Sequence, residues 1–234
     1  MHVIKNVLET LDSVGIEEVI FEPTENGTLL RGSNKDKNVV VFHEIPDEIT
    51  EHPMGIQSVK GLLSRLNLFE TDKAQMAFTE AGDAIGNITI KQGRKKASYK
   101  CIEPEHVHAP KRIPGDIDMS KCITFDKEYV EYLSQAFSSM GYTGDKSERT
   151  VSIGVRDNNL SLNIFDGEDD SFNDTIEIEH DDIDTSSWEV VPFQRVMKQS
   201  VACSASLEAN FVITEHGVVV FDVSGISIIV APVA

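Results

Sequence analysis

Two alternating histidines, with possible metal ligands close by, are the residues of this sequence best suited to chemistry. On an extended strand His106 and His108 would share one face. Three further candidate ligands lie nearby in the chain: Cys101, Glu103 and Glu105. Imidazole, thiolate and carboxylate groups bind zinc, but this stretch lacks the ligand spacing of a structural zinc site. A metal-dependent hydrolase on an α+β scaffold, using these histidines and the nearby acids, is kept as an alternative function.

No other stretch has the pattern of a catalytic or cofactor-binding motif. The acidic run at residues 166–170 lacks the ligand order of an EF-hand loop and is typical of a solvated turn. The sequence contains no phosphate-binding Gly-Lys-Ser/Thr loop, nucleophile elbow or dinucleotide fingerprint. Carboxylates are so abundant that no pair stands out as general acid and base. We predict that the protein is not an enzyme and has no cofactor and no metal.

The charge of the chain argues against binding of nucleic acid through an evenly basic surface. The 234 residues carry a formal net charge of −18 at pH 7, so a polyanion would be repelled at long range. Contact with nucleic acid would have to be local or topological. The apolar fraction of 40% is typical of a folded protein, and the length suits one large domain or two of about 115 residues.

The cysteines and the absence of long apolar stretches favour a cytoplasmic protein with no membrane partner. Cys101, Cys122 and Cys203 are an odd number without close pairing, which is typical of a reducing compartment. A disulfide between Cys101 and Cys122 stays open. The first residues carry charges throughout, and no stretch approaches the length of a membrane span.

Four amphipathic segments that would position any site recur at wide spacing. Helices are predicted at residues 2–14, 55–69, 126–140 and 192–204. The second and fourth contain two bases each and no acid, which is notable in so acidic a chain: Lys60 with Arg65, and Arg195 with Lys198. The first and third carry Lys5 and Lys127 together with acids. These bases are either ordinary solvated side chains or a local site for anions.

Short strands separated by turn residues follow each predicted helix. They cover residues 15–23, 26–34, 38–46, 74–80, 87–93 and 96–104, and then 150–157, 159–167, 174–181, 207–216, 217–224 and 226–234. Between these two sets the chain has three prolines, Pro104, Pro110 and Pro114, and little periodicity. We therefore predict two similar domains, 1–103 and 121–234, joined by an extended connector at 104–120.

This organisation resembles the sliding clamps, the processivity factors of DNA polymerases, and most closely those of tailed phages. The resemblance is carried by residues 38–49 running into 55–69, by 97–114, and by 172–184 leading to 192–201. It implies an α+β protein, similar to the proliferating cell nuclear antigen fold, with two tandem clamp domains that each pack two helices on antiparallel sheets. Three chains would form a ring of six domains with the helices lining the hole.

The resemblance also implies a function. A clamp encircles double-stranded DNA without reading its sequence, is placed there by a clamp loader, and tethers the replicative DNA polymerase without catalysing a reaction. For a phage protein this would occur in the host cytoplasm. The helix bases are carried over as residues that face DNA: Lys5, Lys60, Arg65, Lys127, Arg195 and Lys198.

Two further sites follow from the resemblance. Two strands of opposite charge would form the head-to-tail subunit contact: Lys95, Lys96, Ser98 and Lys100 on one, and Thr175, Glu177 and Glu179 on the other. Alternatively, both are edge strands that charge protects from aggregation. Partner peptides would dock in an apolar groove that includes Ile113, Ile228, Val230 and Pro232, although Ile228 and Val230 could equally lie in a buried last strand. An acidic protein that mimics DNA is a further alternative.

Overall fold

A computed structural model describes residues 1–111, 117–140, 149–166 and 171–233. The chain divides into two compact units, Met1–Arg112 and Ile113–Ala234. The division lies within the proline-rich stretch 104–120. No helix of the described residues is long and apolar enough to span a membrane.

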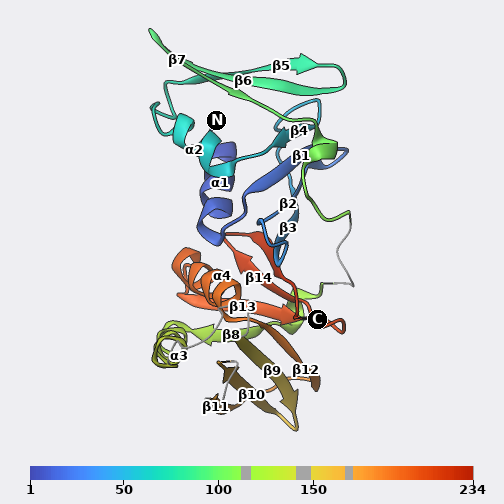
Figure 1. The fold of residues 1–234 in the computed structure, drawn as a ribbon, viewed down its shortest axis with the longest axis vertical. Coiled ribbons are helices and arrows are strands. Elements are labelled where there is room, and N and C mark those ends of the chain that lie inside the picture. Colours follow the sequence, from blue (N-terminus) through green and yellow to red (C-terminus); the bar gives the residue numbers. More distant parts are fainter. Residues whose placement is uncertain (112–116, 141–148, 167–170, 234) are drawn as a thin grey trace. The chain divides into compact units, whose positions relative to one another are not determined.

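The first unit packs two helices on antiparallel strands (Figure 1). Strands β4, β1, β2 and β3 pair in that order, and β5, β6 and β7 form a separate sheet in chain order. The elements are α1 (His2–Val14), β1 (Glu18–Thr24), β2 (Gly27–Ser33), β3 (Val39–Ile45), β4 (Met54–Ile56), α2 (Val59–Leu66), β5 (Gln75–Ala81), β6 (Ala84–Gln92), β7 (Lys95–Lys100) and the 3-10 turn η1 (Pro104–His106).

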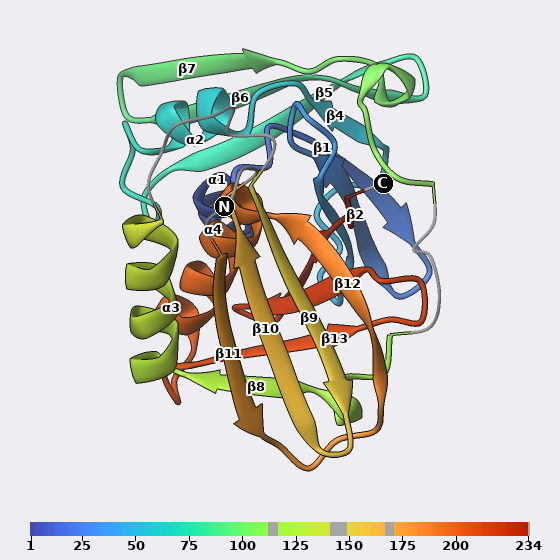
Figure 2. The same ribbon diagram turned by 60° about the horizontal axis from the view of Figure 1, so that its bottom comes forward.

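The second unit repeats this architecture and adds one strand. Strands β12, β9, β10 and β11 pair in that order and lie side by side in Figure 2. Strands β13, β14 and β15 pair in chain order, and β8 flanks β13. The elements are η2 (Met119–Lys121), β8 (Ile123–Asp126), α3 (Lys127–Ser139), β9 (Thr150–Arg156), β10 (Asn159–Phe165), β11 (Ser171–Glu177), β12 (Ile183–Glu189), α4 (Val190–Cys203), β13 (Glu208–Ile213), β14 (Val219–Val223) and β15 (Ile226–Val230).

The two units therefore have the same fold. In each, a helix precedes four strands whose fourth member pairs with the first, and a second helix precedes three strands that pair in chain order. All of these strand pairs are antiparallel. The expectation of an α+β chain with two tandem domains of this type is confirmed.

Each helix buries the apolar stripe that predicted it. In α1 the buried side chains recur at helical spacing, and the helix ends at Gly15, whose φ of 85° suits a residue without Cβ. In α2 the Ser58 side chain accepts a hydrogen bond from the Gly61 amide at 3.0 Å. A Cβ at Gly61 would lie 2.8 Å from Ser58 Oγ, so this helix keeps a glycine despite its low helix propensity.

Each unit has its own apolar core, and that of the second unit is rich in aromatic rings. Trp188 stacks on Phe193 with 5.6 Å between ring centroids, and Phe193 meets Phe221 edge to face at 5.3 Å. Phe221 in turn lies 5.2 Å from Phe211. Helix α4 is thereby fixed on β14 and β13 by rings that are fully buried.

Three strands were not predicted, and one helix is shorter than predicted. Strands β4, β8 and β12 fall outside the predicted set, and α2 begins at Val59 instead of residue 55. Residues 54–56 pair with β1 instead of starting the helix, and Ser58 supplies the helix cap. The apolar residues before Val59 made the predicted helix too long. Hydrophobic periodicity does not show whether a short apolar segment continues a helix or pairs with a strand.

The first part of the predicted connector is held on the first unit. The Ser33 hydroxyl donates a hydrogen bond to the His108 carbonyl at 2.7 Å, and Arg31 donates one to the Pro110 carbonyl at 3.0 Å. The side chain of Val107 is buried. The expectation of a wholly extended connector is wrong at Pro104–His106, which forms a 3-10 turn. Residues 112–116 lie outside the described part of the chain.

Candidate nucleic-acid interface

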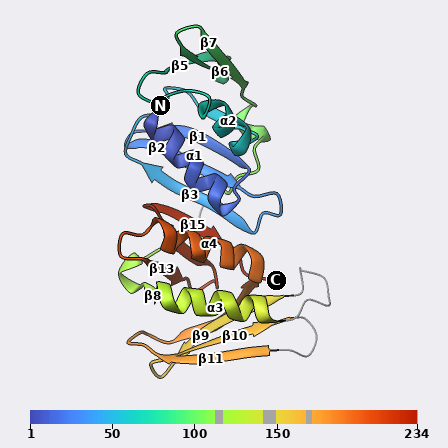
Figure 3. The ribbon, with the colours of Figure 1, turned by 90° about the vertical axis from the view of Figure 1, so that its left-hand side faces the viewer.

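The helices lie in pairs, and the bases expected to face DNA lie on them. Helix α1 contacts α2 in the first unit, and α3 contacts α4 in the second (Figure 3). Each pair buries one face on its own unit and leaves the opposite face exposed. Any cation on these outward faces can therefore approach a ligand without disturbing the core.

Lys60, Arg195 and Lys198 are exposed on α2 and α4. Within the described residues none of these three side chains has an ion-pair or hydrogen-bond partner, and we call them the unpaired cations. Neither helix contains an acidic residue. Because no carboxylate of the described residues forms an ion pair with them, these side chains form positive surface in a chain whose net charge is −18.

Arg65 is placed differently from the sequence expectation. It is only partly exposed, and its guanidinium donates hydrogen bonds to the Ser98 carbonyl at 3.0 Å and the Gly61 carbonyl at 2.6 Å. The guanidinium carbon also lies 5.3 Å from the centroid of the Tyr99 ring. Arg65 therefore ties α2 to β7 and is already engaged within the chain.

Lys5 and Lys127 each pair with an acid one helical turn further on. Lys5 Nζ lies 3.7 Å from a carboxylate oxygen of Glu9, and Lys127 Nζ lies 3.7 Å from one of Glu131. Such i,i+4 pairs at a helix surface are weak, but they cancel charge locally. Lys127 also lines a groove between α3 and α4 together with Lys198, above an apolar floor that includes Val130.

The two oppositely charged segments lie at sheet edges. Strand β7 ends the β5–β6–β7 sheet, and β11 ends the sheet in which it pairs with β10. On β7 the exposed side chains are those of Lys95, Lys96, Ser98 and Lys100. On β11 they include Thr175 and Glu177, whereas Glu179 follows the strand end. Cations and anions thus occupy separate edges in separate units.

Two tyrosines that the sequence reasoning overlooked connect α3 to the edge strand β11. Tyr129 donates a hydrogen bond from its hydroxyl to an Asp174 carboxylate oxygen at 3.1 Å. Burial, and then the Asp174 charge, raise the pKa of Tyr129, which keeps this hydroxyl protonated as a donor. Tyr132 is exposed and meets Phe172 edge to face at 5.8 Å. Their spacing of three residues on a helix was the available signal.

The proposed peptide groove is wrong for two of its residues. Ile228 and Val230 are both 0% exposed, because β15 packs into the core of the second unit and cannot present them to a peptide. Pro232 lies nearer the surface and is half-buried. Ile113 lies outside the described residues, so its expected role stays a prediction.

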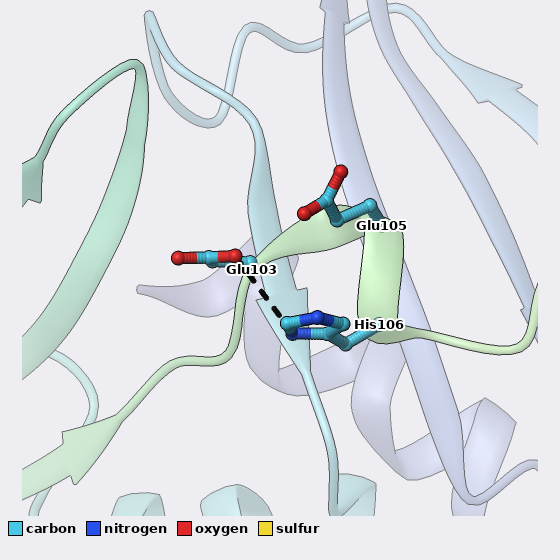
Figure 4. Close-up of side chains that lie close together, drawn as sticks. All are labelled: Glu103, Glu105 and His106. Carbon is cyan, nitrogen blue, oxygen red and sulfur yellow. Dashed lines mark ion pairs between the residues drawn. The ribbon is translucent and has the colours of Figure 1, made fainter.

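His106 and His108 do not form one site. His106 belongs to the 3-10 turn, where Nδ1 lies 3.8 Å from a Glu103 carboxylate oxygen (Figure 4). His108 instead lies against Glu18, with Nδ1 3.1 Å from a carboxylate oxygen. The expectation that both histidines share one face of an extended strand is therefore wrong. The chain is not extended here, because His106 lies in a 3-10 turn, and the two side chains contact different residues.

Three possible ligands do remain together on this turn. Single ligand atoms of Glu103, Glu105 and His106 lie within 4.8 Å of one another, and all three side chains are exposed (Figure 4). Cys101 is a poor additional ligand, because burial raises the pKa of its thiol to about 12. All three cysteines are free, so the disulfide considered between Cys101 and Cys122 is not formed. Most of the other acidic run, residues 167–170, lies outside the described residues.

Two tandem domains with this strand order and paired helices define the sliding-clamp fold, and the chain has that fold. Proliferating cell nuclear antigen (PCNA) from Entamoeba histolytica is similar over 98% of this chain and 94% of its own, with a TM-score of 0.62 and 15% identity. The A. fulgidus PCNA, solved with the C-terminal region of FEN-1 bound, is similar over 99% of this chain and 95% of its own, with a TM-score of 0.64 and 15% identity.

A putative DNA polymerase III beta subunit from Eubacterium rectale has a TM-score of 0.71 at 13% identity. It matches 99% of this chain, which spans only 62% of that longer chain. No protein-family model and no curated protein matches the sequence. These likenesses establish the fold, and the phage type expected from the sequence stays a prediction.

Proposed function

We propose that the protein is a sliding clamp that encircles double-stranded DNA and tethers a DNA polymerase. The observation that carries this proposal is the position of the unpaired cations. In an acidic chain with the clamp fold, they lie on the outward faces of the second helix of each unit. Lysine and arginine contacts to phosphates are independent of sequence, as a protein that moves along DNA requires. The remaining acidic surface would repel DNA from other approaches.

We propose a ring of three chains, with six domains in all. The chain covers 95% of the A. fulgidus PCNA but 62% of the bacterial beta subunit, which fits a two-domain protomer. The partners proposed are the polymerase, a clamp loader and peptide segments comparable to the FEN-1 region bound to that PCNA. The alternatives are not favoured. In the hydrolase alternative, His108 lies against Glu18 and apart from His106, and burial keeps the Cys101 thiol protonated. A DNA mimic does not require cation-bearing helices.

A ring that encloses DNA predicts a specific mass and a topological mode of binding. At high protein concentration, light scattering should give three times 25.9 kDa. After assembly on a linear duplex, dilution into excess competitor DNA should leave the protein on duplexes whose two ends are blocked by bound streptavidin. Duplexes with open ends should lose it, because a ring can slide off. A single-chain mass at every concentration, or equal loss from both duplexes, would contradict the proposal.

The subunit contact is proposed to be head-to-tail pairing of β7 with β11 of the next chain. Replacing Lys95 and Lys96 by glutamate should weaken it, because two cations that face anions become repulsive. Exposed ion pairs contribute up to about 1 kcal/mol each, so dissociation constants should rise roughly tenfold or more. Analytical ultracentrifugation over a concentration series measures this change, and rising salt should weaken the unmodified assembly.

Charge exchange provides the matched control for this contact. Adding Glu177→Lys and Glu179→Lys to the doubly substituted chain should restore association, because the attraction returns with opposite sign. Lys35→Glu with Lys37→Glu changes the net charge equally on the turn between β2 and β3 and should leave association unchanged. If the exchange fails to restore the assembly, or this control weakens it equally, the electrostatic contact is refuted.

A further inference from the structure

A histidine in the turn between β11 and β12 contacts η2, near the start of the second unit. His180 Nε2 lies 3.0 Å from the carbonyl oxygen of Lys121, at the end of η2. Its other ring nitrogen, Nδ1, lies 2.8 Å from the carbonyl oxygen of Asp181. The ring therefore bridges two segments that are about sixty residues apart in the chain.

Both partners of this ring are carbonyl oxygens, which can only accept hydrogen bonds. A neutral imidazole has one N–H and would direct its second nitrogen, with a lone pair, at a carbonyl oxygen. The imidazolium ion has two N–H groups and satisfies both carbonyls. We propose that protonated His180 is a latch that fixes the β11–β12 turn to η2, and that loss of its proton releases one of the two bonds.

Charged groups of both signs line the recess that contains His180. The Lys121 ammonium lies 3.1 Å from an Asp181 carboxylate oxygen. This contact raises the pKa of Lys121 and lowers that of Asp181, so both stay charged near neutral pH. Arg156, at the end of β9, lines the same recess and pairs with Asp182 and Asp184. Asp118 and Glu215 line the same recess, so carboxylates outnumber the two bases around the ring.

The sign of the pH dependence follows from this geometry. At low pH the protonated ring makes both hydrogen bonds, and the turn is held. As pH rises through the range in which histidines lose their charge, one bond is replaced by a contact between two acceptors. The turn should therefore open more often above neutral pH. Because β11 is the strand proposed to meet the next chain, this latch would also regulate that contact, but it does not require a ring.

Hydrogen exchange measured by mass spectrometry tests the latch on the full chain, at a concentration too low for association. After correction for the intrinsic pH dependence of exchange, peptides that cover residues 176–183 should be about tenfold more protected at pH 6 than at pH 8, as expected for loss of one charge-assisted hydrogen bond. His180→Phe should show the lower protection at both pH values. His106→Phe removes an exposed histidine from the first unit and should behave as the unmodified chain does.

Nitrogen NMR of the unmodified protein gives a second readout that does not depend on any variant folding. At pH 6 both ring nitrogens of His180 should show the chemical shifts of protonated nitrogen, and His180→Phe identifies the signals. A neutral His180 at pH 6 would overturn the proposal. So would equal corrected protection at pH 6 and pH 8, or a pH dependence that persists in His180→Phe.

Discussion

A chain with the unpaired cations Lys60, Arg195 and Lys198 replaced by glutamate should load onto end-blocked duplex at least about tenfold less than the unmodified protein, while its ring mass stays unchanged. The three side chains are exposed, they have no partner within the described residues, and they lie on the outward faces of α2 and α4. Their reversal therefore removes attraction to phosphate without breaking an internal contact, and adds repulsion in its place.

The salt dependence of binding gives this prediction a second measurement. Each phosphate contact contributes about 0.9 to the slope of log affinity against log salt concentration, so three lost contacts in each of three chains should lower the slope for ring binding by up to about 8. Fluorescence anisotropy with an open-ended duplex at several salt concentrations gives both slopes. Fold and ring mass should not change, because none of these side chains is buried.

A charge-matched variant separates local contact from net charge. Lys35, Lys37 and Lys111 are exposed and lie outside the helices, so their replacement by glutamate alters the net charge equally. This variant should load almost as the unmodified chain does. Unchanged loading after reversal of the unpaired cations, or an equal loss in the matched variant, would remove the DNA-facing role assigned to α2 and α4.

Trp188→Ala should lower the free energy of unfolding of the second unit by about 3–5 kcal/mol, the usual range for removing a large buried aromatic side chain. Trp188 is 0% exposed, stacks on Phe193, and donates a hydrogen bond from Nε1 to the Gly217 carbonyl at 3.0 Å. Because domains of this size are stable by only about 5–15 kcal/mol, the variant should lose much of its folded population on mild heating.

Urea denaturation followed by circular dichroism measures this loss of stability. A second variant separates the contribution of the ring from that of the hydrogen bond. Trp188→Phe keeps a ring on Phe193 but leaves the Gly217 carbonyl without its donor, so it should cost about 1–3 kcal/mol. Val191→Ala alters an exposed residue of α4 and serves as the control, with a change within about 0.5 kcal/mol. If Trp188→Ala proves as stable as this control, the aromatic core does not hold α4 as described.

Periodicity predicted those elements whose burial follows from their own sequence. The stripes that define α1, α3 and α4 are the stripes that the structure buries, and the repeated order of elements revealed two similar domains. Strand β4 has only three residues, and β12 has the polar sequence IDTSSWE, so neither stands out by hydrophobicity. Each forms because it pairs with the first strand of its own set, which a local pattern cannot reveal.

Prediction of the candidate site was limited by tertiary neighbours. The sequence identified the bases of α2 and α4 correctly as helix residues, but it could not show that Arg65 meets the Ser98 carbonyl, which lies 33 positions away. It also could not separate His106 from His108, because their directions depend on a short turn and on Glu18. The apolar residues 226–234 were compatible with both a peptide groove and a buried strand. Only the packing of the second unit shows that Ile228 and Val230 are buried.

The position of Arg65 joins two surfaces of the first unit through one side chain. Its guanidinium uses two of its five N–H donors, one on the Gly61 carbonyl within α2 and one on the Ser98 carbonyl of β7. The donors that remain on Nη1 and Nη2 can still bind a phosphate while Nε holds the edge strand. A polyanion bound at α2 would therefore be one side chain away from β7, the strand proposed to pair with the next chain, so that occupancy at the first site can bias the geometry of the second.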